Sequence, residues 1–341
     1  MKHRIYQSLS AALIAVTLAA CSGSADGKKD SAAVTPASPA AQAEIVEIER
    51  FDRAVAAYPS LSSESRDSLR TLYAPVIDLM RAVNGGGSDD QLMMALASSA
   101  ATKVFQPDVE RLLPDLSAPS AALGAVKVAA ERELPGLTFP SRVIGYVTPY
   151  SQSVVIADSV VLLGLNHFLG ADYEGYGSFD EYVRRTKTPS QIPYQVAEAL
   201  IRSQYPYDES DGQTVLSRLL YEGAVAAAVE RIVPGATAAA ALGYDADEMK
   251  WLADNEPRIW QRMASEDMLF SVDPSIAHRL TGPAPSTPLI NPQAPGRAGR
   301  YIGYRIVGSY LKSHAETQLS ALLRREFFQS PTALKESGYR P

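Results

Sequence analysis

The sequence predicts an α+β fold that is mostly helical and carries a small β-sheet. Two long regions, one on each side of the middle of the chain, place apolar residues at helical spacing. The middle itself, residues 142–165, consists of short apolar runs rich in β-forming residues. With 46% hydrophobic and 21% charged residues, the composition is that of a globular protein that can build a sizeable core.

The first 20 residues are organised like a bacterial signal peptide. Lys2 and Arg4 give a positive start, and a short apolar segment, residues 9–18, leads to Ala19, Ala20 and Cys21. The order Leu-Ala-Ala-Cys resembles the bacterial lipobox, so we expect cleavage before Cys21 and attachment of lipid, including palmitate, to that residue. The alternative is an ordinary signal peptide with a cysteine after the cut.

Cys21 is the only cysteine, so no intramolecular disulfide can form. A lipidated Cys21 also leaves no thiol for nucleophilic catalysis. No other stretch reaches the ~18 apolar residues of a transmembrane helix. We therefore expect contact with the membrane through the lipid anchor.

The segment that follows Cys21 has no hydrophobic period and is rich in Ala, Ser, Pro and Gly. The expected organisation is a signal peptide over residues 1–20, a lipidated flexible tether over 21–43 and a globular domain over 44–341. The formal net charge of −6 becomes −8 once Lys2 and Arg4 are removed. An acidic chain is a poor counterion for phosphates, which argues against nucleic acid as a partner.

The N-terminal part of the globular region predicts a series of helices. Residues 62–83 have helical spacing, with Ser62 or Ser63 as the cap and three glycines, residues 85–87, as the end. Prolines separate the helices that we expect next. These cover residues 89–103, 108–113 and 119–133.

The middle of the chain predicts three strands. Residues 142–148 and 153–157 flank a turn at 149–151, which indicates a hairpin or two adjacent strands, and residues 160–165 form a third. Further helices are expected after them, at residues 193–204, 214–233, 245–265 and 297–315. The Pro-rich segment 273–295 between the last two is expected to be an ordered surface loop.

Local motifs for common catalytic sites are absent from the sequence. The histidines, His3, His167, His278 and His314, are widely separated, and no pair has metal-ligand spacing. Neither a Gly-x-Ser-x-Gly motif nor a phosphate-binding loop occurs. Acidic groups have simpler interpretations: a helix start for Asp245, Asp247 and Glu248, and a solvated turn rather than a calcium loop for Asp208, Glu209 and Asp211. We expect no cofactor and no metal.

One helical segment invites comparison with metalloproteases. In zincins, the helix after the sheet carries His-Glu-x-x-His, which puts two imidazoles on one face. Residues 197–201 of this chain read Ala-Glu-Ala-Leu-Ile, so the glutamate, Glu198, is present and both histidine positions are apolar. A later Glu-Gly pair at Glu222 looks like the stretch that supplies a third ligand in some of these enzymes. The alternative is an Ala-rich amphipathic helix that contains a glutamate by chance.

Four stretches between Gly164 and Tyr310 form a recognisable set: Gly164–Gly170 with Asp172 and Tyr173; Leu219–Gly223; Gly243–Trp251 with Asn255, Glu256, Ile259, Trp260 and Leu269–Pro274; and Pro295–Val307 with Tyr310. In their order and spacing these stretches resemble the gliding-motility lipoprotein family of Bacteroidetes, the GldB-like proteins. In one departure from the family, Asn166 stands where an acid is expected. The N-terminal helices match only in general character.

The resemblance implies a cell-envelope lipoprotein of the gliding or type IX secretion machinery, on the periplasmic or the outer-membrane face. It also implies a zincin-like domain that lacks the zinc-ligand histidines. We therefore expect a non-catalytic protein that acts through contacts with envelope proteins; the alternative is an envelope hydrolase, a peptidase with a non-standard site.

The helix at residues 297–315 carries the remaining candidate site residues. Gly296, Gly299 and Gly303 permit close approach of another backbone. Arg297, Arg300 and Arg305 could contact Glu198, Glu222 or a partner protein, and the alternative is plain helix packing with a solvated basic face. The candidate degenerate site or interface comprises Glu198, Glu222, Arg297, Gly299, Arg300 and Gly303.

Overall fold

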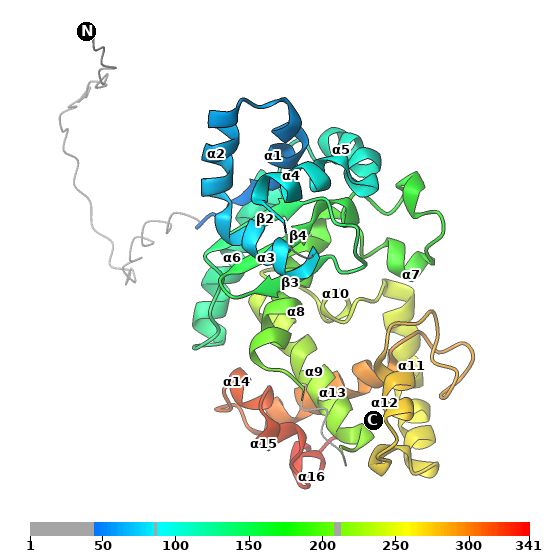
Figure 1. The fold of residues 1–341 in the computed structure, drawn as a ribbon. Coiled ribbons are helices and arrows are strands. Elements are labelled where there is room, and N and C mark those ends of the chain that lie inside the picture. The colour runs from blue at the N-terminus through cyan, green and yellow to red at the C-terminus, as the bar shows by residue number, and fades with distance from the viewer. Residues whose placement is uncertain (1–43, 85–86, 208–212) are drawn as a thin grey trace, which may run out of the picture. The chain divides into compact units, whose positions relative to one another are not determined.

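The computed structural model describes residues 44–84, 87–207 and 213–341, all within one unit of the chain, Gln42–Pro341 (Figure 1). The signal peptide, Cys21 and the tether lie outside the described residues. So do Gly85 and Gly86 and the acidic residues Asp208, Glu209 and Asp211. Within the described residues, no helix is both long and apolar enough to cross a bilayer.

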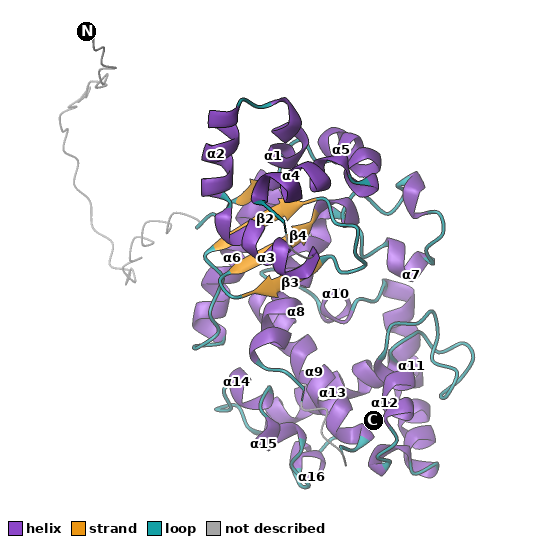
Figure 2. Ribbon diagram, in the orientation of Figure 1, coloured by secondary structure: helices purple, strands orange, loops and turns teal. Residues whose placement is uncertain are grey.

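A four-stranded mixed sheet lies in the N-terminal part of this unit (Figure 2). Its order is β1 (Ile48–Arg50), β2 (Arg142–Tyr146), β4 (Val160–Gly164) and β3 (Val154–Ala157). The first three strands are parallel, and β3 runs antiparallel to β4 at one edge. The α+β prediction and the three strands in the middle of the chain are therefore confirmed.

The pairing of these strands corrects one expectation and adds a strand. The turn at residues 149–151 does not close a hairpin, because β2 pairs in parallel with β4 and β3 folds back on β4. The tight turn lies instead at Asp158, which adopts a left-handed φ of 47°. The sequence missed β1 because three residues are too few to show an alternating pattern.

Helices cover both faces of the sheet. On one face Ile144 and Leu162 pack with residues of the first four helices, including Phe51, Ile77 and Met93. The other face packs against the fifth, sixth and eighth helices. The helices up to the eighth are α1 (Phe51–Ala57), α2 (Ser63–Leu72), α3 (Ala74–Asn84), α4 (Asp89–Ser98), α5 (Ala100–Leu112), α6 (Ser117–Glu133), α7 (Glu181–Arg184) and α8 (Ile192–Gln204).

Two predicted helix boundaries were wrong. The helix expected at residues 62–83 breaks at Tyr73, because Pro75 supplies no N–H for a continuous helix. The boundary expected between residues 103 and 108 lies instead at Ser99. The Ser99 hydroxyl accepts a hydrogen bond from Thr102 N at 3.1 Å and starts α5, which then continues through Pro107.

The C-terminal part of the chain is helical. Residues 273–295 are not entirely loop, because Asp273 caps α12 through Ser275 N at 2.8 Å. The three short helices at the C-terminus were not predicted. The helices are α9 (Val215–Ile232), α10 (Ala238–Leu242), α11 (Ala246–Ser265), α12 (Pro274–Thr281), α13 (Ala298–Ser313), α14 (Leu319–Leu322), α15 (Arg325–Phe328) and α16 (Ala333–Ser337). Single 3-10 turns lie at Tyr58–Ser60, Leu165–His167, Glu174–Tyr176, Pro189–Gln191 and Met268–Phe270.

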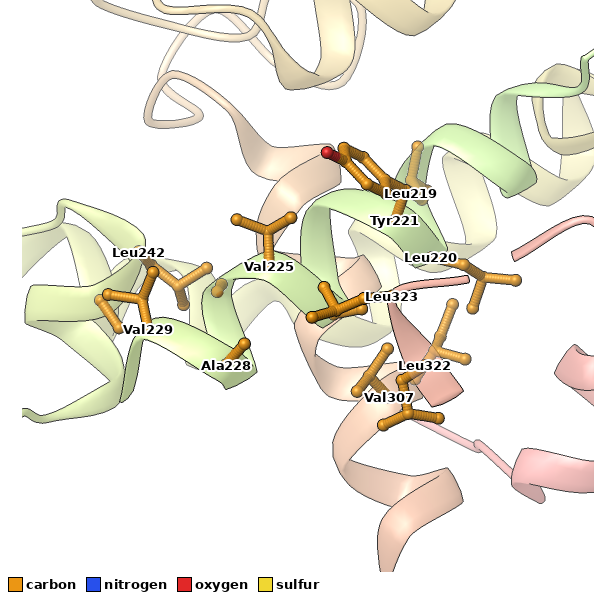
Figure 3. Packing of buried hydrophobic residues seen from close by; sticks show 14 of the residues in the cluster. Leu219, Leu220, Tyr221, Val225, Ala228, Val229, Leu242, Val307, Leu322 and Leu323 are labelled. Atoms are coloured by element: carbon orange, nitrogen blue, oxygen red, sulfur yellow. The ribbon is translucent and has the colours of Figure 1, made fainter. Parts of the chain in front are cut away.

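Helix α9 runs through the centre of the helical core and is buried on nearly every side. Figure 3 shows its side chains beside Val307 of α13, Leu242 of α10 and the pair Leu322 and Leu323. Where α9 crosses α13, Gly223 lies against Gly303. A Cβ atom on Gly303 would come within 1.8 Å of the Leu219 carbonyl oxygen, so the crossing requires glycine there.

Candidate functional site

Helix α8 presents Glu198 at its partly exposed face and buries its other faces. Pro193 stands in the first turn, where a missing N–H costs nothing. Ala197 and Ile201, at the two histidine positions of the metalloprotease pattern, are fully buried in the helical core. The Glu198 side chain keeps 29% of its surface exposed. The sequence therefore places one carboxylate at the surface of α8 with apolar residues at both ligand positions.

Glu222 on α9 meets Glu198 through an arginine of α8. The Glu222 side chain is 4% exposed and binds Arg202 Nη2 at 2.5 Å and Arg218 Nε at 3.0 Å. Arg202 also binds Glu198 Oε1 through Nη2 at 2.8 Å and Nε at 2.9 Å. The cation that joins the two carboxylates is thus the Arg202 guanidinium.

Arg300 reaches the same cluster from α13. Its side chain is 4% exposed, and Nη2 donates to Glu198 Oε2 at 3.0 Å and to the Ala241 carbonyl oxygen at 3.4 Å. Its Nε is buried and has no hydrogen-bond partner among the described residues. Arg300 is therefore not part of a solvated basic face.

Two glycines let α13 come close enough for this contact. Gly303 lies against α9 at Leu219 and Gly223. A Cβ atom on Gly299 would lie 2.9 Å from the Leu280 carbonyl oxygen of α12. Both glycines therefore allow the close packing of the helix that carries Arg300.

Arg297 stands immediately before α13 in a left-handed conformation, with φ of 61°. Its carbonyl oxygen accepts hydrogen bonds from Tyr244 Oη at 2.9 Å and from Arg300 N at 2.8 Å. Its half-buried guanidinium lies near Gly243 at the end of α10. No residue that the structure describes forms a hydrogen bond or an ion pair with that guanidinium.

The arginines dominate the electrostatics of the cluster. Burial would raise the pKa of Glu198, but Arg300, Arg202 and Arg297 hold it well below its ordinary value. Burial opposes the ionised form of Glu222 as well, and Arg202 lowers its pKa nonetheless. Both carboxylates are therefore ionised at neutral pH and serve as counterions.

The positive charges outnumber the negative ones. Among the described residues of the cluster, four arginines, Arg202, Arg218, Arg297 and Arg300, face the two carboxylates Glu198 and Glu222. Burial, and then the neighbouring Arg300, lower the pKa of Arg297, while Glu198 acts in the opposite direction.

The family model described as gliding motility protein GldB matches residues 34–341. The chain belongs to the GldB family. The short name of the family, GldB_lipo, indicates a family of lipoproteins. No curated protein and no solved structure matches the chain.

The stretches that resembled the GldB family occupy defined places in this fold. Leu219–Gly223 and Pro295–Val307 supply Glu222, Arg297 and Arg300 to the cluster. Gly164–Gly170 lies at the end of β4, where Asn166 holds the backbone of Thr148: its Oδ1 accepts from Thr148 N and its Nδ2 donates to Thr148 O, both at 2.9 Å. Here Asn166 serves as a structural clamp, because an ionised acid cannot donate.

The sequence did not foresee the surroundings of His167 in this GldB-family protein. His167 Nδ1 lies 2.8 Å from Lys187 Nζ, and His167 Nε2 lies 2.9 Å from the Tyr150 carbonyl oxygen. The Lys187 ammonium sits over the rings of Tyr176 and Phe179. Burial, and then the Lys187 charge, lower the pKa of His167 to about 4, so His167 is neutral at pH 7.

The remaining sequence candidates lie apart from this cluster. Asp245 and Glu248 form the capping box of α11 and also bind Arg185. Arg305 is exposed and pairs with Glu256 at 3.3 Å. His314 stacks on Tyr310. In the described part of the chain, no three His, Cys, Asp or Glu side chains are placed to hold a metal ion together.

Proposed function

We propose that this GldB-family protein is a non-catalytic, lipid-anchored component of the cell envelope that serves the gliding or type IX secretion machinery through protein contacts. The observation that carries the proposal is the Arg202 guanidinium between Glu198 and Glu222. These are the carboxylates that a hydrolase derived from the metalloprotease pattern would use. In this chain both carboxylates form ion pairs with arginines.

The chemistry of the two carboxylates supports this proposal. A general base works best when its pKa lies near the working pH, whereas arginines hold the pKa of Glu198 far below that range. A catalytic zinc takes three protein ligands with lone pairs. Ala197 and Ile201 have none to offer, and both side chains are packed in the helical core.

Zinc binding and peptidase activity test the non-catalytic role. The full-length lipoprotein, purified in detergent, is exposed to zinc, dialysed extensively and analysed for metal and for peptidase activity. We expect neither stoichiometric zinc nor activity. Near-stoichiometric zinc that is lost together with peptidase activity in Glu198→Gln would instead establish an envelope peptidase.

Substitution of the proposed lipidated residue tests the anchor. Cys21→Ala should abolish palmitate labelling and move the protein out of the membrane fraction, because several acyl chains on one residue hold a protein on a bilayer. A serine-to-alanine change at Ser24 in the expected tether is the matched control and should leave labelling and fractionation unchanged. A Cys21→Ala protein that still labels and pellets with membranes would refute the anchor.

Co-purification tests the partner. Mild crosslinking of cells followed by capture of the lipoprotein should recover envelope proteins of the gliding or secretion machinery. Recovery of none of these proteins, under conditions that retain the lipoprotein in the membrane, would contradict the proposed role.

A further inference from the structure

The uncompensated positive charge at the start of α13 has the properties of a binding site. Arg297 is half-buried, and its guanidinium has no hydrogen-bond or ion-pair partner among the described residues. Its neighbour Arg300 is almost completely buried, yet its Nε has no partner in the described part of the chain. Unpaired donors are costly to bury, so the buried Arg300 Nε indicates a missing acceptor, and the half-buried guanidinium of the neighbouring Arg297 offers donors that a ligand could use.

The N-terminus of α13 adds to the positive electrostatic potential around Arg297. Helix α13 has 16 residues and no acidic residue in its first turn; Arg297 gives it no side-chain cap, and the Thr287 hydroxyl accepts a hydrogen bond from Ala298 N at 3.1 Å. The positive end of the helix dipole therefore remains without a compensating negative charge from its own first turn. An anion beside Arg297 would satisfy the guanidinium and the dipole together.

The conformation of Arg297 indicates that its side chain is needed. Glycine adopts a left-handed φ at almost no cost, whereas another residue is strained there. Gly296 directly precedes Arg297, so the chain already contains glycine at this turn. An arginine at the left-handed position is explained if its guanidinium contributes something that glycine cannot.

We propose that Arg297, supported by Arg300 and the start of α13, binds a carboxylate group of a protein partner. A guanidinium and a carboxylate are both planar and can form two parallel hydrogen bonds. A phosphate would bring more negative charge next to the ionised Glu198. The inference rests on the proposed function only in taking the ligand from a protein.

Two matched probes isolate the carboxylate. N-acetyl-trialanine ends in a free carboxylate, and N-acetyl-trialanine amide differs only in lacking that charge. The full-length lipoprotein in detergent is titrated with each probe, and with phosphate and chloride, at constant ionic strength and pH. The thermal unfolding midpoint reports binding, because a ligand that binds only the folded state raises it.

The variants are Arg297→Gly, which keeps the left-handed turn without strain, and Lys312→Gln, which removes one positive charge from the exposed far end of α13. At about ten times its Kd, the carboxylate probe should raise the midpoint of wild type and Lys312→Gln by a few degrees. The amide and chloride should not. In Arg297→Gly the affinity for the carboxylate probe should fall by roughly tenfold or more.

The opposite results are equally clear. Equal shifts in wild type and Arg297→Gly, equal shifts with acid and amide, or no shift with any probe would each overturn the site. A larger shift with phosphate that Arg297→Gly abolishes would overturn the assignment to a carboxylate. Peptidase activity in the zinc experiment would overturn the proposed function and leave the probe result untouched.

Discussion

The sheet region and the helical region each bury a cluster of arginines and carboxylates, but only one cluster is balanced. Asp52 of α1 is 1% exposed. Its oxygens accept hydrogen bonds from Arg50 Nε at 2.8 Å and Arg50 Nη2 at 2.7 Å. Arg50 Nη1 donates to the Leu113 carbonyl oxygen at 2.9 Å, so every nitrogen of this guanidinium is bonded. In the helical region Arg297 has no such partner among the described residues.

The difference in ion pairing distinguishes the structural pair Arg50–Asp52 from the candidate binding site at Arg297. Buried charges stabilise a fold only when their desolvation is offset by good pairing. Arg50 and Asp52 meet that condition and join β1, α1 and α5. The half-buried charge of Arg297 does not meet that condition within the described residues, which is what the proposed binding role requires.

The largest expected effect comes from breaking the balanced part of the helical cluster. Glu222→Ala removes the buried carboxylate that Arg202 and Arg218 share, and Arg202 keeps its ion pair with Glu198. Removal of one member of a buried pair costs about 3–5 kcal/mol. We expect a loss of that size in the free energy of unfolding, measured with urea. Glu316→Ala, at an exposed site, is the control; a loss below about 1 kcal/mol for Glu222→Ala would show that the cluster is not structural.

The pH dependence of stability sharpens the comparison through His167, which is buried in the sheet region as a neutral base. Its folded pKa of about 4 lies below the ordinary value of 6.5, so the unfolded chain binds the proton more tightly. The stabilising effect is complete above pH 6.5 and is lost as the pH falls toward 4. The loss amounts to about 3 kcal/mol at one pKa unit per 1.36 kcal/mol.

Urea unfolding at several pH values, compared between wild type and His167→Gln, isolates this contribution. Both proteins keep His278 and His314, so those residues cancel in the difference. The variant should lose less stability than wild type between pH 6.5 and pH 4. Parallel stability curves for the two proteins would contradict the burial of a neutral His167.

Much of this arrangement could be predicted from the sequence, because local patterns report local structure. The Glu198 to Arg202 spacing of four residues places both side chains on one face of α8 and could have indicated their ion pair. The contact of Arg300 with Glu198 spans 102 residues and depends on how α13 crosses α9. The spacing of apolar residues along the sequence does not predict how α13 crosses α9, although Gly299 and Gly303 indicated where another backbone could approach closely.

The contacts that the sequence could not supply have a common cause. His167 ends the 3-10 turn Leu165–His167 and Lys187 lies in a loop 20 residues later, and no spacing rule joins a lysine to a histidine. The surplus charge at Arg297 is visible only when every neighbour has been placed. A binding site of this kind is recognised by the absence of an ion-pair partner around a charged side chain. That absence is a property of the three-dimensional surroundings, and the spacing of residues along the sequence does not record it.

A smaller effect is expected where α9 and α13 touch. Gly303→Ala would drive a Cβ atom into the Leu219 carbonyl oxygen, 1.8 Å away before relaxation. Overpacking of this kind costs about 1–3 kcal/mol. Gly308→Ala is a matched control on the same helix, since its Cβ would meet nothing within 4 Å. It should stabilise by about 0.5–1 kcal/mol through helix propensity, and destabilisation by both changes alike would refute the close crossing.

The smallest expected change in stability gives the most direct comparison of the cluster around Arg297 with the pair Arg50–Asp52. Arg297→Gly should stabilise the protein by about 1 kcal/mol, because it relieves a left-handed non-glycine residue and removes a half-buried cation that lacks a partner among the described residues. Arg50→Gly in the balanced pair should do the opposite, since it strands the buried Asp52. Urea unfolding of both variants without any added anion measures the contrast. If Arg297→Gly destabilised the protein as Arg50→Gly does, then Arg297 would hold the fold together, and its charge would need no external ligand.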